Sequence, residues 1–228
     1  MLRNSEEMNK VRFMTTFHAQ IKDQTDLAHR AAEEAPFIAS LMGGSLTPAA
    51  YLDYLKALAP IYVRMEELFQ RHASLPPLSY FDDRALDRAA HIEADINYLE
   101  KHLTDRHQFR PLLSTERYLG LLSDNISPAR LSAHHYIRYL GDLSGGQAIA
   151  RLVSRHYLIP KDALNFYNFE AIGDVVFYKK RYRDFLNLIP FTEIEIKEFL
   201  DEVQTLYSLS RDIFLELGQL HDSEIIVS

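Results

Sequence analysis

Apolar residues recur at helical spacing along most of the chain, with charged and polar residues between them. In the segment 9–32, Phe13, Phe17 and Ile21 fall close together on one helical face, and Pro36 follows as a stop signal. This spacing predicts an amphipathic helix near the start of the chain.

A longer helix is predicted over residues 46–72. Thr47 suits the N-cap and Pro48 the first helical turn, because the N–H that proline lacks has no helical partner there. Pro60 lies inside the same pattern and predicts a kink, since it removes one helical hydrogen bond.

Helical patterns continue to the end of the chain, and strand patterns are absent from the sequence. The last pattern begins with a capping box, Thr192 and Glu195, and ends at Gly218. The further predicted helices are residues 82–103, 114–124, 127–158, 173–189 and 192–218.

The predicted helix in the middle of the chain is interrupted by RYLGDLSGGQAIARL, residues 138–152. Glycine inside a helix costs about 1 kcal/mol relative to alanine, so several close together need a local reason. Gly141 and Gly145 share one face that carries no side chains, and the run from Ser144 to Gly146 predicts a bend. Such a bare face suits either a closely packed helix or a flat ligand.

Composition narrows the class of protein. The chain has 228 residues, of which 47% are hydrophobic and 25% charged, and this fits a soluble globular domain with a sizeable core. The net charge of −7 argues against a nucleic-acid binder, and the absence of cysteine excludes disulfides, thiolate ligands and cysteine nucleophiles. Neither a signal peptide nor a run of about 18 apolar residues occurs, so we expect a cytoplasmic protein without membrane contact. We expect a single all-α domain over residues 1–228, with flexible tails at about 1–10 and 219–228.

A family resemblance rests on four sequence segments. The most specific is HHYIRYLGDLSGGQAIAR, which resembles the distal-helix signature of the heme oxygenases. Also similar to that family are AHRAAEEAPF, its proximal-histidine segment, YVRMEELF, its second-helix motif, and FYKKRYRDFLN, its basic helix. The matching regions run from about residue 15 to about residue 218. The chain ends at LHDSEIIVS without the membrane anchor of mammalian members, so we expect the soluble bacterial type.

The resemblance implies a helical bundle in which heme is sandwiched between a proximal helix and a kinked, glycine-rich distal helix. It makes His29 the axial ligand of the heme iron, with His18 and His134 the next candidates among the histidines. Glu33 lies four residues after His29 on the same helical face, where its carboxylate can hold the second ring nitrogen. A surface ion pair is the alternative for that spacing.

Heme carries two propionates, and the resemblance implies cations and hydroxyl groups at the edge of its pocket. The family pattern assigns this role to Lys179 and Arg183, which are four residues apart on one face, together with Lys22 and Tyr136. A solvated helix face is the usual alternative for such a basic run. The resemblance also puts apolar side chains against the heme, namely Tyr207 and Phe214, with Phe37, Ile38 and Leu41.

Asp142 carries the chemistry that the resemblance implies. The family uses this aspartate to hold a water network on the distal side of the heme, supported by the residues that match Tyr62, Tyr118 and Arg138. An outward-facing aspartate on the helix surface is the alternative, because burying a carboxylate is costly unless it is hydrogen-bonded.

The implied reaction is oxidative cleavage of heme b at one meso carbon, which we expect to be the α carbon, to biliverdin, iron and carbon monoxide. Gly141 and Gly145 would press the bound dioxygen sideways toward that carbon. Heme is then both cofactor and substrate, dioxygen is consumed, and electrons come from a ferredoxin or a flavin reductase. We expect the protein to act as a monomer.

Two departures from the family pattern lie beside the distal network. Ser210 stands where many relatives have asparagine, and Ile137 where mammalian members have threonine. A heme store or carrier is the alternative function, since it would keep His29 and the propionate cations but would not need Asp142. A di-iron oxidase would need Glu-x-x-His pairs, which the sequence lacks, and a thiaminase-like hydrolase would need a cysteine.

Overall fold

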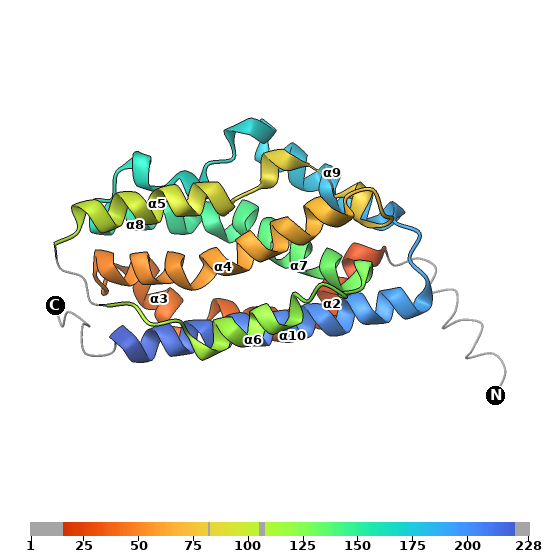
Figure 1. Ribbon diagram of the computed structural model, residues 1–228, viewed down its shortest axis with the longest axis horizontal. Helices are drawn as coiled ribbons and strands as arrows, with labels where there is room; N and C mark the ends of the chain where they lie inside the picture. Colours follow the sequence, from red (N-terminus) through yellow and green to blue (C-terminus); the bar gives the residue numbers. More distant parts are fainter. Residues whose placement is uncertain (1–15, 82, 105–107, 222–228) are drawn as a thin grey trace.

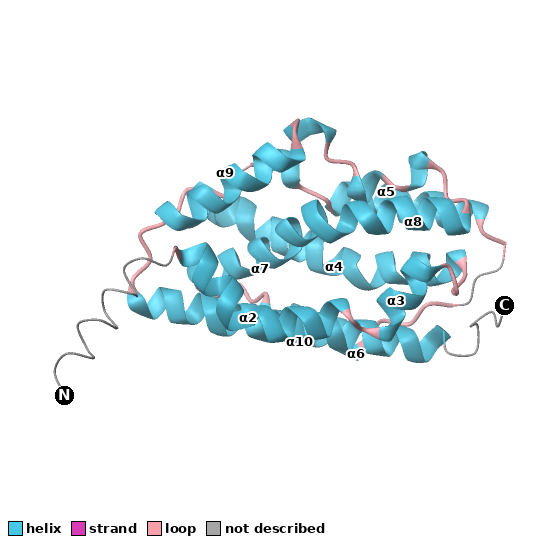
Figure 2. Ribbon diagram, turned by 180° about the vertical axis from the view of Figure 1, so that it is seen from behind, coloured by secondary structure: helices cyan, strands magenta, loops and turns pink. Residues whose placement is uncertain are grey.

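Helices and short helical turns make up the regular structure of the computed structural model, which describes residues 16–81, 83–104 and 108–221 (Figure 1). No strand occurs in these ranges, which confirms the predicted all-α class (Figure 2). The α-helices are α2 (Phe17–Glu33), α3 (Pro36–Gly43), α4 (Pro48–His72), α5 (Ala89–His102), α6 (Leu113–Leu121), α7 (Pro128–Gly141), α8 (Gln147–Tyr157), α9 (Val175–Leu188) and α10 (Glu193–His221). Short 3₁₀ turns occupy Leu78–Tyr80, Arg84–Leu86, Lys161–Ala163, Asn165–Tyr167 and Glu170–Ile172.

The first predicted helix is observed as α2. Its N-cap is Thr16, whose Oγ1 accepts a hydrogen bond from the N–H of Ala19 at 3.3 Å. The part of that prediction over residues 9–15, like the predicted tail at 1–10, lies outside the described ranges. Pro36 was expected to close this region, but it opens α3, because a proline fits the first turn of a helix as readily as it ends one.

The helix α4 begins as predicted, with Thr47 at the N-cap and Pro48 at the first helical position. It continues through Pro60 as one helix and buries most of its length in the core. Because α4 runs through the middle of the bundle, its side chains reach both the cavity described below and α5 (Figure 1).

The helix α5 begins at Ala89, seven residues later than the predicted start at residue 82. The reason lies on α4, where Glu66 accepts hydrogen bonds from the backbone N–H of Arg88 at 2.5 Å and of Ala89 at 3.0 Å. A carboxylate from another helix therefore caps the start of α5, and the preceding residues form a 3₁₀ turn instead.

The helix α10 is the long base of the bundle and packs along α2, α7, α6 and α3 (Figure 1). Its predicted capping box is confirmed, since the N–H of Thr192 donates to Glu195 Oε2 at 2.8 Å and the N–H of Glu195 donates to Thr192 Oγ1 at 3.3 Å. The predicted stop at Gly218 is wrong, because α10 runs on to His221. There the buried Nε2 of His221 lies 3.1 Å from Asp53 Oδ2 of α4, which fixes the last turn. The remainder of the predicted C-terminal tail lies outside the described ranges.

The glycine-rich interruption is a single π-helical turn, Asp142–Gly146, between α7 and α8. A π turn inserts an extra residue into a helical turn and is a recognised cause of helix bending. The π turn lies where the sequence predicts a bend, and residues of the turn line the cavity described below.

Candidate functional site

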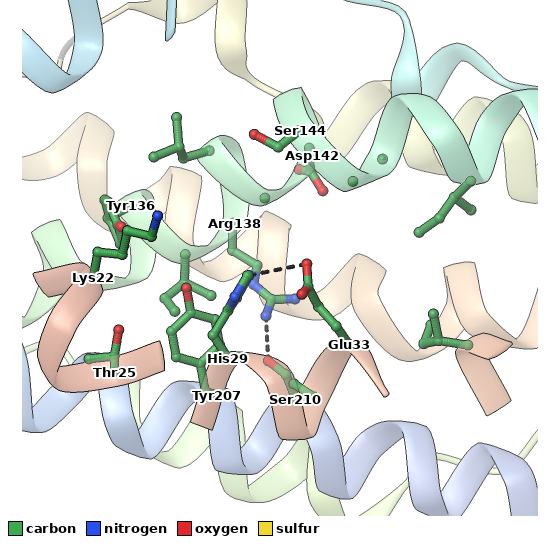
Figure 3. Close-up of a pocket in the computed structure, with 18 of the residues that line it drawn as sticks. Lys22, Thr25, His29, Glu33, Tyr136, Arg138, Asp142, Ser144, Tyr207 and Ser210 are labelled. Atoms are coloured by element: carbon green, nitrogen blue, oxygen red, sulfur yellow. Dashed lines mark hydrogen bonds and ion pairs between the residues drawn. The ribbon is translucent and has the colours of Figure 1, made fainter. Parts of the chain in front are cut away.

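A cavity of about 560 Å³ lies between α2 on one side and α7, the π turn and α8 on the other (Figure 3). Residues of α10 line a third side of it. The cavity brings together most of the residues that the sequence singled out, namely Lys22, His29, Glu33, Ile38, Tyr136, Arg138, Gly141, Asp142, Gly145, Arg183, Tyr207 and Phe214.

His29 projects from α2 into the cavity, and its side chain is 43% exposed. Its Nε2 lies 3.3 Å from Glu33 Oε1, one helical turn later, a contact that fits both the predicted pairing and the surface ion pair named as its alternative (Figure 3). The ring of Tyr207 from α10 meets the imidazole edge-to-face, with the two centroids 5.1 Å apart. Two contacts thus orient the imidazole.

The opposite wall of the cavity is formed by Gly141 and Gly145, which we call the glycine wall. A Cβ atom added at either position would meet no atom within 4 Å, so the bare backbone borders open space. Gly146 differs, because a Cβ there would lie 2.8 Å from the ring of Tyr167. Of the two alternatives for the bare face, close packing therefore explains Gly146, whereas the glycine wall leaves room for a ligand.

Asp142 lies beside the glycine wall with only 8% of its surface exposed, so it is not an outward-facing residue. Tyr62 of α4 donates a hydrogen bond from its hydroxyl to Asp142 Oδ2 at 2.6 Å. Burial raises the pKa of Asp142 to about 7, although the Tyr62 hydrogen bond and the charge of Arg138 oppose the rise. Near neutral pH this carboxyl can therefore both hold and release a proton.

Arg138 reaches from α7 across the inner end of the cavity toward α10 (Figure 3). Its Nη2 donates to Ser210 Oγ at 2.5 Å, and Ser210 Oγ in turn donates to the carbonyl of Leu206 at 2.7 Å. The guanidinium also lies over the ring of Tyr118, 5.3 Å from its centroid. Ser210 is therefore an anchor for Arg138, while the other departure, Ile137, contributes an apolar side chain to the cavity lining.

Basic and hydroxyl groups gather at one end of the cavity. Lys22 of α2, Tyr136 of α7 and Arg183 of α9 all line the cavity. Lys179 does not line it, but its Nζ approaches Ser144 Oγ of the π turn at 3.5 Å. Lys179 and Arg183 are thus unequal, since only Arg183 borders the cavity itself.

Several predicted residues stand behind the cavity lining. Tyr62 and Tyr118 are fully buried and reach the cavity only through Asp142 and Arg138. Phe37 and Leu41 are core residues that do not border the cavity. The alternative iron ligand His134 is also buried away from it and lies 3.0 Å from Glu202. The lining residues that sequence reasoning missed include Thr25, Tyr54, Leu140, Ser144 and Ile149.

Tyr54 is the most informative of the missed residues. It lies on α4 eight residues before Tyr62, so the two share a helical face. The Tyr167 hydroxyl donates to the Tyr54 hydroxyl at 3.2 Å, and burial raises the pKa of Tyr54 to about 12. The helical spacing from Tyr62 was the only signal for Tyr54 in the sequence, and it could not be separated from ordinary core packing.

Two further properties concern membranes and metals. Within the described ranges, no helix is both long and apolar enough to cross a membrane. The same residues contain no group of three or more histidine, aspartate and glutamate side chains placed to hold a metal ion.

Comparisons with known proteins agree on one family. The family model described as heme oxygenase matches residues 15–216. The chain is 30% identical to the heme oxygenase of Pyropia yezoensis over 212 residues, which cover 90% of this chain and 87% of that one. The heme oxygenase structure from Leptospira interrogans is 29% identical, with a TM-score of 0.79, and the match covers 89% of this chain and 100% of that one.

A second solved structure is heme oxygenase-2 from Synechocystis in complex with heme and NO. It is 25% identical to this chain, with a TM-score of 0.83, and the match covers 92% of this chain and 88% of that one. Because the family model spans nearly the whole chain and the fold agrees, this protein belongs to the heme oxygenase family.

Proposed function

We propose that this protein binds heme in the cavity between α2 and the π turn and opens its ring to biliverdin, with release of iron and carbon monoxide. Membership of the heme oxygenase family assigns the reaction, and the geometry of the cavity supports its location. The observation that carries the location is the glycine wall of Gly141 and Gly145, which borders open space in the same cavity that the imidazole of His29 lines.

The residues of the cavity fit a heme. The cavity has a volume of about 560 Å³, which lies in the range of small-molecule and cofactor sites. The glycine wall gives a flat group access to the backbone, and His29 on the other wall is a neutral nitrogen donor of the kind that heme iron accepts. A flat ligand between these two walls would also contact Ile38 and Phe214.

Bound heme supplies an iron centre that activates dioxygen, and heme is at the same time the molecule that is oxidised. We assign His29 as the axial ligand. Glu33 accepts a hydrogen bond from the second ring nitrogen, which fixes the tautomer and the orientation of the imidazole. Tyr207 packs against the ring edge and restricts its rotation.

Asp142 is the proton-handling group of the proposed site. Tyr62 occupies Oδ2, and no described residue hydrogen-bonds Oδ1, so Oδ1 is the atom that can hold a water at the glycine wall. With its pKa raised to about 7, Asp142 can pass a proton to that water and regain one near neutral pH. The pKa of Tyr62 is raised well above its ordinary value by burial and by Asp142, so Tyr62 stays a hydrogen-bond donor.

The glycine wall sets the shape of the reacting space. Because no side chain projects from Gly141 or Gly145, only the backbone limits the direction in which a small molecule bound opposite His29 can lie. We propose that this restriction selects one meso carbon, the α carbon, as the position of cleavage. The electrons would come from a separate protein, a ferredoxin or a flavin reductase, with heme b and dioxygen as the other reactants and the chain acting as a monomer.

A reaction with ascorbate tests this function against heme storage. The heme complex is given ascorbate in air, with catalase added to remove free hydrogen peroxide, and the Soret absorbance of bound heme is followed. We expect the parent protein to lose the Soret band within minutes and Asp142→Asn to lose it much more slowly. A Soret band that stays intact in the parent protein would contradict the proposal and favour a heme carrier.

A further inference from the structure

One end of the cavity carries more hydrogen-bond donors than the sequence motifs account for. His18 lies four residues before Lys22 on the same face of α2, and both line the cavity. Arg183 of α9 and Tyr136 of α7 line it as well, and the rings of His18 and Tyr136 meet edge-to-face with centroids 6.3 Å apart. We call these four residues, His18, Lys22, Tyr136 and Arg183, the basic corner.

Two nitrogens of the basic corner are buried and have no hydrogen-bond partner among the described residues, namely His18 Nδ1 and Arg183 Nε. Buried polar atoms are nearly always paired, so such orphans point to a missing partner. The backbone N–H of His18 donates to Asn187 Oδ1 at 2.9 Å, which ties His18 to the end of α9. The backbone of His18 is therefore held in place, while its buried ring nitrogen Nδ1 has no partner among the described residues.

No carboxylate among the described residues neutralises the positive charge of the basic corner. Lys22 and Arg183 form no ion pair with any described carboxylate. The acids that line the cavity are each engaged elsewhere: Asp26 pairs with Arg30 at 2.6 Å, Glu33 contacts His29 at 3.3 Å, and Asp142 accepts from Tyr62 at 2.6 Å.

We propose that His18 is a further heme-binding residue of this chain and that, in its protonated form, it holds one propionate together with Lys22 and Arg183. This inference rests on heme being the ligand of the cavity, as proposed above. A carboxylate in the basic corner would give His18 Nδ1 and Arg183 Nε an acceptor, and its charge would balance the two cations. His18 thus acts at the edge of the heme, whereas His29 acts on the iron.

The proposed contact couples heme binding to uptake of a proton. In the free protein, burial and then the charges of Arg183 and Lys22 lower the pKa of His18. The groups that face His18 are Lys22 from α2, Arg183 from α9 and Tyr136 from α7, so the bound carboxylate would be the only negative one and would raise that pKa. At pH values between the pKa of His18 in the free protein and its higher pKa in the complex, the affinity for the carboxylate falls as pH rises. The fall is at most about tenfold per pH unit, because one proton is taken up.

Metal-free protoporphyrin IX is the probe that isolates this effect. It carries both propionates but no iron, so ligation by His29 does not contribute to its pH dependence. Asp142, with a pKa of about 7, also faces the cavity, and the comparison is therefore made in full-length protein that carries Asp142→Asn. We expect affinity, measured by porphyrin fluorescence, to be about three- to tenfold higher at pH 6 than at pH 8.

Variants at position 18 give the sharpest comparison. His18→Gln should keep porphyrin binding but lose the difference between pH 6 and pH 8, while His18→Lys, with a permanent charge, should bind tightly at both. The matched control is His102→Gln, because His102 lies at the end of α5, outside the cavity. The dimethyl ester of the porphyrin, which has no carboxylates, should show no pH dependence in any variant.

Other outcomes overturn the inference. An unchanged pH dependence in His18→Gln would assign the proton to another group, and equal affinity at pH 6 and pH 8 before His18 is changed would remove the effect altogether. A protein that fails to bind any porphyrin at either pH would contradict the proposed heme site itself, a result distinct from the loss of pH dependence alone.

Discussion

His29 and Asp142 lie on opposite walls of the cavity, and their surroundings differ. The imidazole of His29 is partly exposed and is oriented by Glu33 and Tyr207. The carboxyl of Asp142 is buried, and its pKa is raised to about 7. These surroundings suit the roles proposed above, His29 as the ligand of the heme iron and Asp142 as the proton-handling group.

His29→Ala tests the ligand. Heme should still bind through the apolar walls and the basic corner, but turnover should fall by more than about a hundredfold, since losing even a residue that supports a ligand typically costs 10–100-fold. Added imidazole should restore part of the activity by filling the space left on α2. Heme affinity is followed by absorbance titration and turnover by biliverdin formation. Full activity without imidazole would show that another residue binds the iron.

Asp142→Asn tests the raised pKa through stability. The folded-state pKa of about 7 lies above the unfolded value of 3.8, so the unfolded chain ionises first as pH rises. The parent protein without heme should then lose stability between pH 4 and pH 7, by about 3 kcal/mol between pH 5 and pH 8 from this group alone. Asparagine removes that loss and can still accept the Tyr62 hydrogen bond. Urea unfolding at pH 5 and pH 8 measures the change in the free energy of unfolding. The same pH dependence in the parent protein and in Asp142→Asn would contradict the raised pKa of Asp142.

The sequence identified His29 and Asp142 because short motifs surround them, but it held no signal for how Arg138 is anchored. Ser210 is 72 residues from Arg138 along the chain, and only the packing of α10 against α7 brings their side chains to 2.5 Å. Tyr54 was missed for a related reason, since an aromatic residue on a buried helix face is usually part of the core.

At the scale of elements, the π turn assigns different tasks to neighbouring glycines. Gly146 fits against the ring of Tyr167, so it serves packing. Gly145 borders the open cavity and serves the ligand space. The sequence alone could not distinguish these two roles, because it shows glycine at both positions and does not show what lies next to each.

Two glycine substitutions should therefore give opposite results. Gly146→Ala should lower the free energy of unfolding by about 1–3 kcal/mol, because its Cβ would overlap a buried ring. Gly145→Leu should leave stability within about 1 kcal/mol, apart from helix propensity, but should block the ligand space, so that heme or dioxygen no longer binds productively. Urea unfolding and heme titration of both variants measure this. Equal effects of the two substitutions on stability would mean that the whole run serves packing.

The helix α9 allows a similar separation of Lys179 and Arg183, the two residues predicted to hold the propionates. Arg183→Gln should weaken heme binding by about tenfold or more, since a hydrogen bond to a charged group contributes about 1.5–3 kcal/mol. Lys179→Gln should change affinity by less than about threefold, because Lys179 lies beside Ser144 and not in the cavity lining. Losing both should let the heme rotate in its plane and give a mixture of biliverdin isomers. Equal losses from the two single variants would contradict the geometry.

Most helices were predictable from periodicity and caps, and the errors came from contacts between distant segments. The start of α5 depends on Glu66 of α4, and the end of α10 depends on Asp53. A sequence window cannot see such partners, so residue 82 and Gly218 were reasonable but wrong boundaries. Pro36 has two meanings in local sequence, a stop and a start, and the structure shows the start of α3.

At the scale of the whole molecule, the bundle holds two walls at a fixed separation. The helix α10 packs along both α2 and α7, so the helix that bears His29 and the helix that leads into the π turn share one support. Figure 1 shows α10 along the lower side of the bundle, next to α2 and α7. The family's sequence motifs predict the residues on each wall, while the distance between the walls is a property of this packing.

The most direct test of the account is the identity of the product. The heme complex of the parent protein is supplied with a reductant in air, and the released tetrapyrrole is separated by chromatography beside authentic biliverdin isomers. We expect one isomer, the α isomer, formed in step with the loss of bound heme, and little of it from Gly145→Leu. Recovery of intact heme from the parent protein would contradict the account, as would an equal yield of biliverdin from Gly145→Leu.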